Sequence, residues 1–245
     1  MDDVTAALTL IRCLDLTSLN DDDSEYTIAT LCSKASTEYG KVAALCVYPR
    51  FIPQVKRELN DASIAAATVV NFPRGNNKLS HLSEEIKTAL SLGADEIDAV
   101  FPYRSFLKGA YKDCEKFLET ARRECGKKHK LKVILETGEL QKASLIAEAT
   151  KLCIDGGADF IKTSTGKSKV SATPEAANAI LETVAAAKRN VGFKASGGIK
   201  TIDDAKKYLI LANAIMGSKW VNPKNFRIGA SSLLDNLIQV IKQGY

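Results

Sequence analysis

Short β-branched and apolar runs alternate with longer stretches of helical periodicity along almost all of the 245 residues. This alternation predicts βαβ units, in which helices cover a sheet of parallel strands. Eight candidate strands favour a closed barrel over an open sheet, so we expect an α/β fold of the (β/α)₈ or TIM-barrel type with a short helical extension at its N-terminus. The candidate strands are Arg12–Asp15, Val42–Val47, Ile64–Val70, Glu96–Phe101, Leu131–Glu136, Asp159–Thr163, Val191–Lys194 and Phe226–Gly229.

Two of the expected helices have clear start signals. Thr173 supplies an N-cap before a first-turn proline and an acid near the positive helix end. Thr201 supplies a second N-cap, followed by two acids in the first turn. No linker or change of composition divides the chain, so we expect one domain over residues 1–245. The clearest expected helices are Ser80–Leu92, Ala143–Asp155, Pro174–Lys188 and Ile202–Leu211.

A short internal repeat relates two of the expected strands. The sequences GADEID (93–98) and GADFIK (157–162) share the frame G-A-D-x-I, in which a glycine ends a helix and the chain turns into a strand. Because side chains alternate along a strand, Asp98 and Lys162 should occupy the same step and point the same way. Both then lie near the carboxyl ends of their strands, where barrel enzymes place their chemistry.

Three ionisable residues lie at strand ends within otherwise apolar runs, namely Asp98, Lys162 and Lys194. Each alone could be an ordinary strand-end charge that reaches solvent. Together they match the needs of a Schiff-base enzyme, because a lysine of pKa ~10.4 is almost entirely protonated at neutral pH and must lose that proton to act as a nucleophile. A second ammonium ~6 Å away would supply about 2–3 kcal/mol toward this, and partial burial the rest. Asp98 could then move protons, directly or through a water molecule.

Glycine-rich turns follow the last expected strands and indicate a phosphate site. Gly197 and Gly198 follow the seventh strand, and the sequence GASS (229–232) leads from the eighth strand into a helix. Backbone N–H groups and a helix start can bind an anion there, and barrels often bind phosphate with these loops. Gly166 and Lys167, after the sixth strand, could add a positive charge.

Composition and charge exclude several other classes of protein. The net charge of +5 comes from basic residues scattered among 29 acidic ones, with no basic block interleaved with aromatics, so we expect no nucleic-acid partner. No run approaches the roughly 20 apolar residues of a membrane span, and the acidic start is not a signal peptide. The six cysteines form no C-x-x-C pair, which favours a reducing cytoplasm over a disulfide framework. His81 and His129 belong to no ligand cluster, so we expect no metal.

These motifs resemble the deoxyribose-phosphate aldolase family, and the resemblance extends from residue 14 to residue 234. It implies a (β/α)₈ barrel that reversibly cleaves 2-deoxy-D-ribose 5-phosphate to acetaldehyde and glyceraldehyde 3-phosphate, with no cofactor. The resemblance allows a homodimer. The stretches on which it rests are LDLTSLNDDD (14–23), CVYPRFIP (46–53), GADEIDAVFPYR (93–104), ILETGEL (134–140), GADFIKTSTGK (157–167), GFKASGGIKT (192–201) and RIGASSLL (227–234).

The resemblance assigns roles to individual residues. Lys162 matches the lysine that forms the Schiff base, Lys194 the lysine that perturbs it, and Asp98 the acid that relays protons. Asp15 resembles a further carboxylate near the substrate hydroxyls. The positions that fall where the family binds phosphate are Gly166, Lys167, Gly197, Gly198, Gly229, Ser231 and Ser232.

Some members of the family end in a tail whose terminal tyrosine reaches the active site. This chain also ends in tyrosine, Tyr245, but the tail after the last helical pattern looks short for that reach, and a frayed terminus is the alternative. Cys46 should face the active-site end of its strand, either as a small buried hydrophobe or as a thiol open to reactive aldehydes. Lys132 and Glu136 share strand parity, which predicts a pair inside the barrel.

Two other functions fit the same fold. One is a different phosphosugar enzyme, either another Schiff-base aldolase or an isomerase that does not use Lys162 as a nucleophile. The other is a sugar-phosphate sensor without turnover. The fold alone does not distinguish them, because barrels of this type host many activities.

Overall fold

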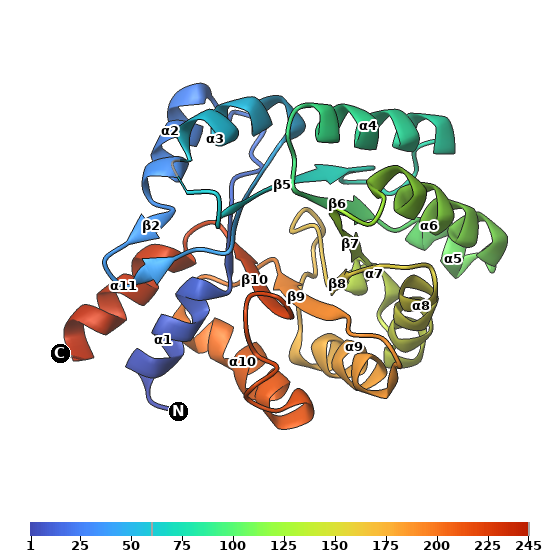
Figure 1. The fold of residues 1–245 in the computed structure, drawn as a ribbon. Helices are drawn as coiled ribbons and strands as arrows, with labels where there is room; N and C mark the ends of the chain where they lie inside the picture. The colour runs from blue at the N-terminus through green and yellow to red at the C-terminus, as the bar shows by residue number, and fades with distance from the viewer. Residues whose placement is uncertain (60, 245) are drawn as a thin grey trace.

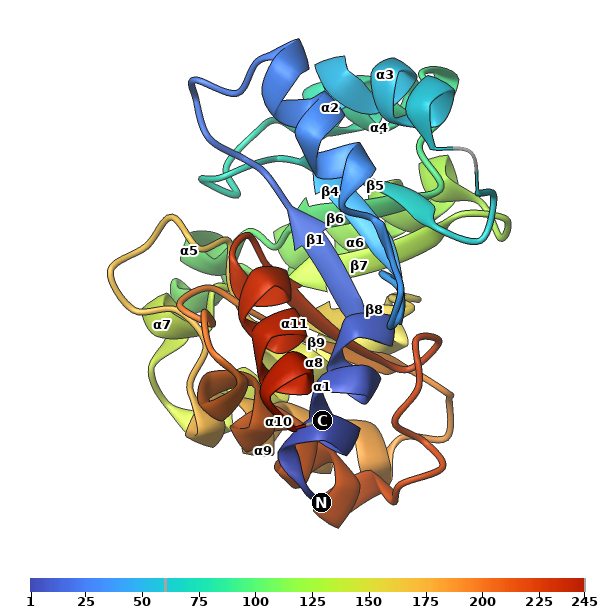
Figure 2. The ribbon, with the colours of Figure 1, turned by 90° about the vertical axis from the view of Figure 1, so that its left-hand side faces the viewer.

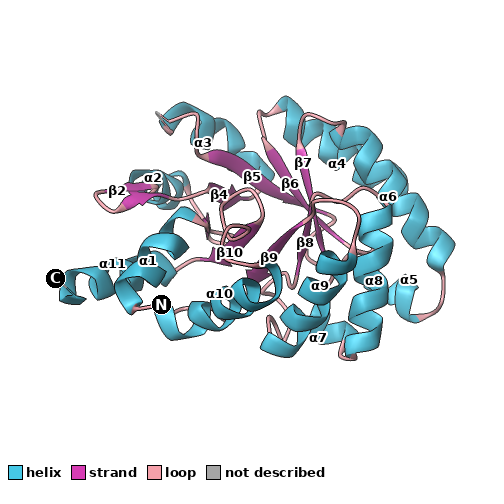
Figure 3. Cartoon of the chain, turned by 60° about the horizontal axis from the view of Figure 1, so that its bottom comes forward, coloured by secondary structure: helices cyan, strands magenta, loops and turns pink. Residues whose placement is uncertain are grey.

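The computed structural model describes residues 1–59 and 61–244, and in it eight parallel strands close into a barrel in the order β1-β10-β9-β8-β7-β6-β5-β4 (Figure 3). The predicted α/β barrel is therefore confirmed. All eight predicted strands are present with ends shifted by up to two residues. Their observed bounds are β1 (Leu14–Thr17), β4 (Ala44–Val47), β5 (Ala65–Val70), β6 (Glu96–Val100), β7 (Lys130–Ile134), β8 (Phe160–Lys162), β9 (Gly192–Ser196) and β10 (Phe226–Ala230).

At least one helix follows each barrel strand, and the helices form a ring around the strands (Figure 1). An antiparallel pair of two-residue strands, β2 (Ser36–Thr37) and β3 (Gly40–Lys41), precedes β4. No helix within residues 1–59 and 61–244 has the length and apolar character to cross a membrane. The helices of the ring are α2 (Glu25–Ser33), the 3₁₀ turn η1 (Pro49–Phe51), α3 (Ile52–Glu58), α4 (Leu79–Ser91), α5 (Tyr103–Leu107), α6 (Tyr111–Cys125), α7 (Thr137–Leu140), α8 (Ala143–Asp155), α9 (Pro174–Ala186), α10 (Ile202–Met216) and α11 (Leu233–Gly244).

The expected N-terminal extension is helix α1 (Asp3–Arg12), which lies against α10 and α11 (Figure 2). The carboxylate of Asp2 accepts a hydrogen bond from the backbone N–H of Thr5 at 2.8 Å and caps this helix. The prediction that a strand begins at Arg12 was wrong, because the helical spacing of buried apolar residues continues to Ile11 and keeps Arg12 in the helix.

Most helix ends follow their sequence signals. Thr173 accepts from the backbone N–H of Ala176 at 3.1 Å, and Thr201 accepts from Asp204 at 3.3 Å in a capping box. Helix α8 has the predicted bounds, and α9 ends two residues before the predicted Lys188. Helix α10 continues five residues beyond its predicted end, because its buried face extends to Ala212.

The two copies of the G-A-D repeat make the same structural contacts. The glycine of each copy has a positive φ, 100° and 92°, as required of a residue that ends a helix and turns into a strand. The aspartates that follow, Asp95 and Asp159, each accept a backbone N–H of the preceding strand, from Ala66 and Leu131 respectively, at 2.8 Å. The repeat therefore aligns β6 with β5 and β8 with β7 in the same way.

Candidate active site

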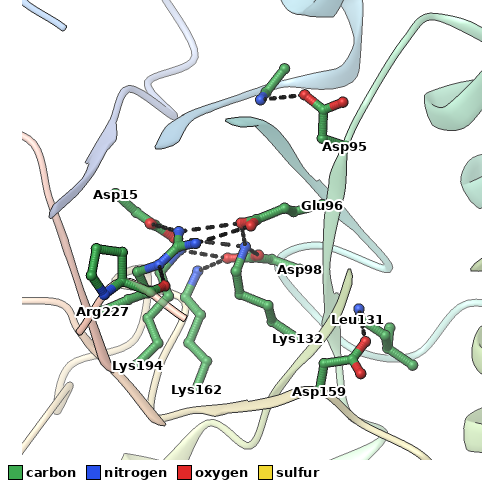
Figure 4. A network of polar contacts seen from close by, with 12 residues as sticks. Asp15, Asp95, Glu96, Asp98, Leu131, Lys132, Asp159, Lys162, Lys194 and Arg227 are labelled. Atoms are coloured by element: carbon green, nitrogen blue, oxygen red, sulfur yellow. Dashed lines mark hydrogen bonds and ion pairs between the residues drawn. The ribbon is translucent and has the colours of Figure 1, made fainter. Parts of the chain in front are cut away.

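Seven charged side chains fill the interior of the barrel, where packed apolar residues are usual (Figure 4). All seven are at most 4% exposed. They come from β1, β6, β7, β8, β9 and β10, and ion pairs join them into one cluster, here termed the interior charge network. Its members are Asp15, Glu96, Asp98, Lys132, Lys162, Lys194 and Arg227.

Asp98 lies at the centre of this network and joins the three predicted catalytic residues. Its Oδ2 atom accepts from the ammonium groups of both Lys162 and Lys194, each at 2.8 Å, and its Oδ1 atom accepts from Lys132 at 2.7 Å. The strand register brings this about, because Lys162 pairs with Lys194 across β8 and β9, and Asp98 points inward from the equivalent step of β6. The two lysines are thus immediate neighbours on one carboxylate oxygen.

A second set of contacts lies nearer the amino ends of the strands. Asp15 accepts from Lys194 and from Arg227, both at 2.5 Å. Glu96 contacts the ammonium of Lys132 at 2.6 Å and the guanidinium of Arg227 at 3.1 Å. Lys194 therefore has two carboxylate partners, Asp15 and Asp98, whereas Lys162 pairs with Asp98 alone among the members of the network.

The electrostatic environment shifts the pKa values of Lys162 and Lys194 in opposite directions. Burial lowers the pKa of Lys162, the charge of Lys194 lowers it further, and the attraction of Asp98 only partly opposes these effects. Burial acts on Lys194 in the same direction, but Asp15 and Asp98 outweigh it and raise the pKa of Lys194 above its ordinary value. Burial also opposes ionisation of Asp98, yet the three lysines around it hold the pKa of Asp98 well below its usual range. Lys162 is therefore suited to lose a proton, and Lys194 to keep one.

The charge count of the network gives the same assignment. Four basic side chains face three carboxylates, so the fully ionised cluster has one excess positive charge inside the barrel. An uncompensated buried charge is costly, and loss of one proton removes it. Lys162 has the fewest carboxylate partners and a lowered pKa, so it is the member that releases this proton most easily.

A cavity of about 180 Å³ opens above Lys162 at the carboxyl ends of the strands. Among the seven residues of the network, Lys162 alone lines this cavity. A nucleophile at this position can reach a substrate from solvent, while its partners stay covered. The lining also includes Thr17, Leu19, Asn20, Thr165, Gly166, Lys167, Ser196, Gly197, Gly198, Ile199, Lys200, Gly229, Ala230 and Ser231.

Six of the eight predicted substrate-binding residues line the cavity, namely Gly166, Lys167, Gly197, Gly198, Gly229 and Ser231. Ser232 is exposed just before α11 and does not line it. Asp15 does not line it either, because it lies buried in the network against Lys194. Gly229 leaves room for that lysine, since a Cβ atom at this position would lie 2.9 Å from Lys194 Cε.

Comparison with known proteins identifies the family. A sequence model described as "DeoC/LacD family aldolase" matches residues 9–237. The chain belongs to the DeoC/LacD aldolase family. A curated deoxyribose-phosphate aldolase from Agrobacterium fabrum (strain C58) is 47% identical over 240 residues, which cover 98% of this chain and 92% of the relative.

Solved structures of other aldolases have the same fold as this family member. A structure described as a putative deoxyribose-phosphate aldolase from Coccidioides immitis is 28% identical, with a TM-score of 0.84 over 95% of this chain and 86% of its own. One from Toxoplasma gondii ME49, described in the same words, is 24% identical, with a TM-score of 0.87 over 98% and 95% of the two chains.

Sequence reasoning missed part of the network in this DeoC/LacD aldolase. Glu96 and Arg227 were not expected to take part, although each lies two residues before an inward-facing position, Asp98 and Gly229. Charged residues at i and i+2 in an otherwise apolar strand point to the same side of the sheet. This spacing was the signal that could have revealed them.

The predicted pair between Lys132 and Glu136 was wrong. Lys132 contacts Asp98 and Glu96 inside the barrel. Glu136 lies beyond the end of β7, where its backbone has a positive φ of 56°, so the strand alternation no longer applies to it. Its carboxylate contacts a loop that follows β8 instead.

Two further predictions concern residues at the margin of the site. Cys46 is fully buried, burial raises the pKa of its thiol, and it packs among small apolar side chains, so the buried-hydrophobe interpretation holds. The predicted role of Tyr245 lies outside the described residues and stays a prediction.

Proposed function

We propose that this chain is a class I, metal-independent aldolase that reversibly cleaves 2-deoxy-D-ribose 5-phosphate to acetaldehyde and D-glyceraldehyde 3-phosphate, in the breakdown of deoxyribose phosphates. The observation that supports this best is the position of Lys162. It is the one network residue that lines the cavity, and burial and Lys194 lower its pKa. An amine with these properties is an activated nucleophile for a carbonyl carbon. The 47% identical relative is a deoxyribose-phosphate aldolase.

The reaction in the cleavage direction begins with attack of the free amine of Lys162 on C1 of the open-chain sugar. Loss of water gives an iminium. The C3 hydroxyl then loses its proton as the C2–C3 bond breaks, and the bonding electrons move to C2 and into the iminium nitrogen, which gives an enamine and releases glyceraldehyde 3-phosphate. Protonation of the enamine at C2 and hydrolysis release acetaldehyde. Asp98, which is 2.8 Å from Lys162 Nζ, is the group we assign to proton transfer, directly or through water.

The same proposal assigns the phosphate to the outer part of the cavity. Gly166, Gly197 and Gly198 line it with positive φ angles of 79°, 91° and 78°, which a residue with a Cβ atom rarely adopts. These glycines leave the backbone open to the cavity, where N–H groups can approach an anion. Lys167 adds a cation, and Ser231, just before α11, adds a hydroxyl. A substrate bound here by its phosphate would place its other end toward Lys162.

Two broader features belong to the proposal as well. We propose a cytoplasmic enzyme, because its six cysteines are buried as free thiols. We also propose a homodimer, and this rests on the family resemblance alone. A solved deoxyribose phosphate aldolase from Aeropyrum pernix, 24% identical to this chain, is tetrameric.

The assay that tests the proposed function follows acetaldehyde and glyceraldehyde 3-phosphate released from 2-deoxy-D-ribose 5-phosphate. We expect equimolar products, and we expect excess EDTA to leave the rate unchanged within about twofold, because the iminium nitrogen and not a metal accepts the electrons. Sugar isomerisation without carbon–carbon cleavage would favour the isomerase. Binding without any turnover would favour a sensor, and loss of the rate with EDTA would contradict the metal-independent mechanism.

A further inference from the structure

Glu136 is a buried acid that the proposed mechanism does not use. We infer that Glu136 is a positioning residue, which fixes the shape of the loop 163–172 so that Gly166 and Lys167 face the phosphate of the substrate. This inference rests on the proposed function. It gives a role to a residue that neither lines the cavity nor joins the interior charge network.

The contacts of the Glu136 carboxylate all reach into one loop. Its Oε2 atom accepts from the Thr165 hydroxyl at 2.5 Å. Its Oε1 atom accepts from the backbone N–H of Thr165 at 3.3 Å and is 2.9 Å from the hydroxyl of Ser168. Glu136 itself is 2% exposed. A buried carboxylate with several donors from one segment fixes that segment, because the two buried donors of Thr165 would otherwise lose their partner away from water.

The backbone around Glu136 is shaped to make these contacts. Glu136 adopts φ 56° and ψ 61° between β7 and α7, a left-handed conformation that is uncommon for a residue with a side chain. Just beyond it, the backbone N–H of Thr137 donates to the carbonyl of Thr163 at 3.0 Å. A Cβ atom at Gly138 would lie 2.1 Å from the carbonyl oxygen of Val170, so both ends of the loop touch this turn directly.

Thr165 connects the buried carboxylate to the cavity. Its hydroxyl donates to Glu136 and accepts from the backbone N–H of Lys167 at 3.0 Å. Thr165, Gly166 and Lys167 all line the cavity, whereas Glu136 does not. Glu136 therefore acts on substrate through the loop. A carboxylate near a phosphate is unfavourable by charge alone, so a structural task fits Glu136 better than a binding one.

The experiment compares Glu136→Ala and Glu136→Gln with a matched control, Glu139→Ala, which removes an exposed acid from helix α7, three residues after Glu136. We expect Glu136→Ala to raise KM for 2-deoxyribose 5-phosphate about tenfold and to change kcat less than about threefold, since the two buried donors of Thr165 and the half-buried hydroxyl of Ser168 lose this acceptor. The Kd of inorganic phosphate, from a phosphorus NMR titration, should rise by the same factor. Glu136→Gln keeps the volume of the side chain and one acceptor oxygen, so its KM and phosphate Kd should lie between those of the wild type and of Glu136→Ala. Glu139→Ala should match the wild type.

A second variant separates positioning from general loss of structure. Ser168→Ala removes one of the loop contacts, and its effect on KM should be less than additive with that of Glu136→Ala if both act through the same loop. Unchanged KM and phosphate Kd in folded Glu136 variants would overturn the inference. A loss in kcat with a shifted pH profile would also overturn it, since this would make Glu136 a proton-transfer group.

These outcomes are distinct from failure of the proposed function. If the wild type binds phosphate but does not cleave 2-deoxyribose 5-phosphate, the proposed function fails, and the phosphate titration still tests the role of Glu136. If the wild type does not bind phosphate at millimolar concentrations, the inference itself is wrong.

Discussion

Replacing Lys162 with leucine should abolish cleavage of 2-deoxyribose 5-phosphate, with a loss of roughly 10⁴-fold or more, because the covalent route depends on the buried amine of Lys162. The other two lysines that line the cavity, Lys167 and Lys200, are exposed and lie outside the interior charge network. The variant should remain folded. Without Lys162 the interior charge network has three cations and three carboxylates, so the excess positive charge is removed and no carboxylate is left unpaired. Turnover is measured by product release, and stability by thermal unfolding.

The matched control for this variant is Lys151→Leu, which removes a lysine that is 75% exposed on α8. It should leave the rate unchanged. A Lys162→Leu protein that unfolds at the wild-type temperature and still turns over within tenfold of the wild type would contradict the assignment of Lys162 as nucleophile.

Replacing Lys194 with leucine should lower the rate at neutral pH by about 100-fold or more, and the reason is the charge balance of the network. Three cations, one of them protonated Lys162, then face three carboxylates. The charges of the network balance only while Lys162 keeps its proton. The pKa of Lys162 should therefore rise toward its ordinary value. Since the reaction uses the free amine, the rising limb of the rate should move to higher pH, and raising the pH should partly restore the rate.

The pH dependence distinguishes this account from simple loss of a contact. In the wild type, the pKa of Lys162 is lowered by burial and by Lys194, so the free amine is present at lower pH than for an ordinary lysine. The measurement is kcat/KM against pH for both proteins. A Lys194→Leu variant with near-wild-type rates at neutral pH, or with a lower rate but an unmoved rising limb, would contradict the electrostatic role of Lys194.

The strands and the meeting of Asp98 with Lys162 were predictable because their signals are local. Eight apolar runs gave the barrel, and the repeated G-A-D frame placed Asp98 and Lys162 at the same strand step. The first strand was predicted too early because helix α1 continues through Arg12, where a helical and a strand pattern overlap. The strands β2 and β3 have two residues each, too short for an alternating pattern to be recognised.

The part of the interior charge network nearer the amino ends of the strands depends on contacts between residues distant in sequence. The loop contacts of Glu136 do so as well. Arg227 pairs with Asp15, which is 212 positions away, and the sequence shows only that both are charged. The left-handed backbone of Glu136 has no local signal such as glycine, because the loop contacts that stabilise it come from residues 165 and 168. Such features follow from tertiary packing and not from local pattern.

In the proposed mechanism Lys162, and not Lys194, forms the Schiff base. The most direct test of this assignment is borohydride reduction of the protein in the presence of acetaldehyde, followed by peptide mass mapping. We predict one reduced ethyl group on Lys162, because this lysine lines the cavity and has the lowered pKa. An adduct on Lys194 would reverse the two roles, and no adduct on either lysine in folded protein would contradict the Schiff-base mechanism.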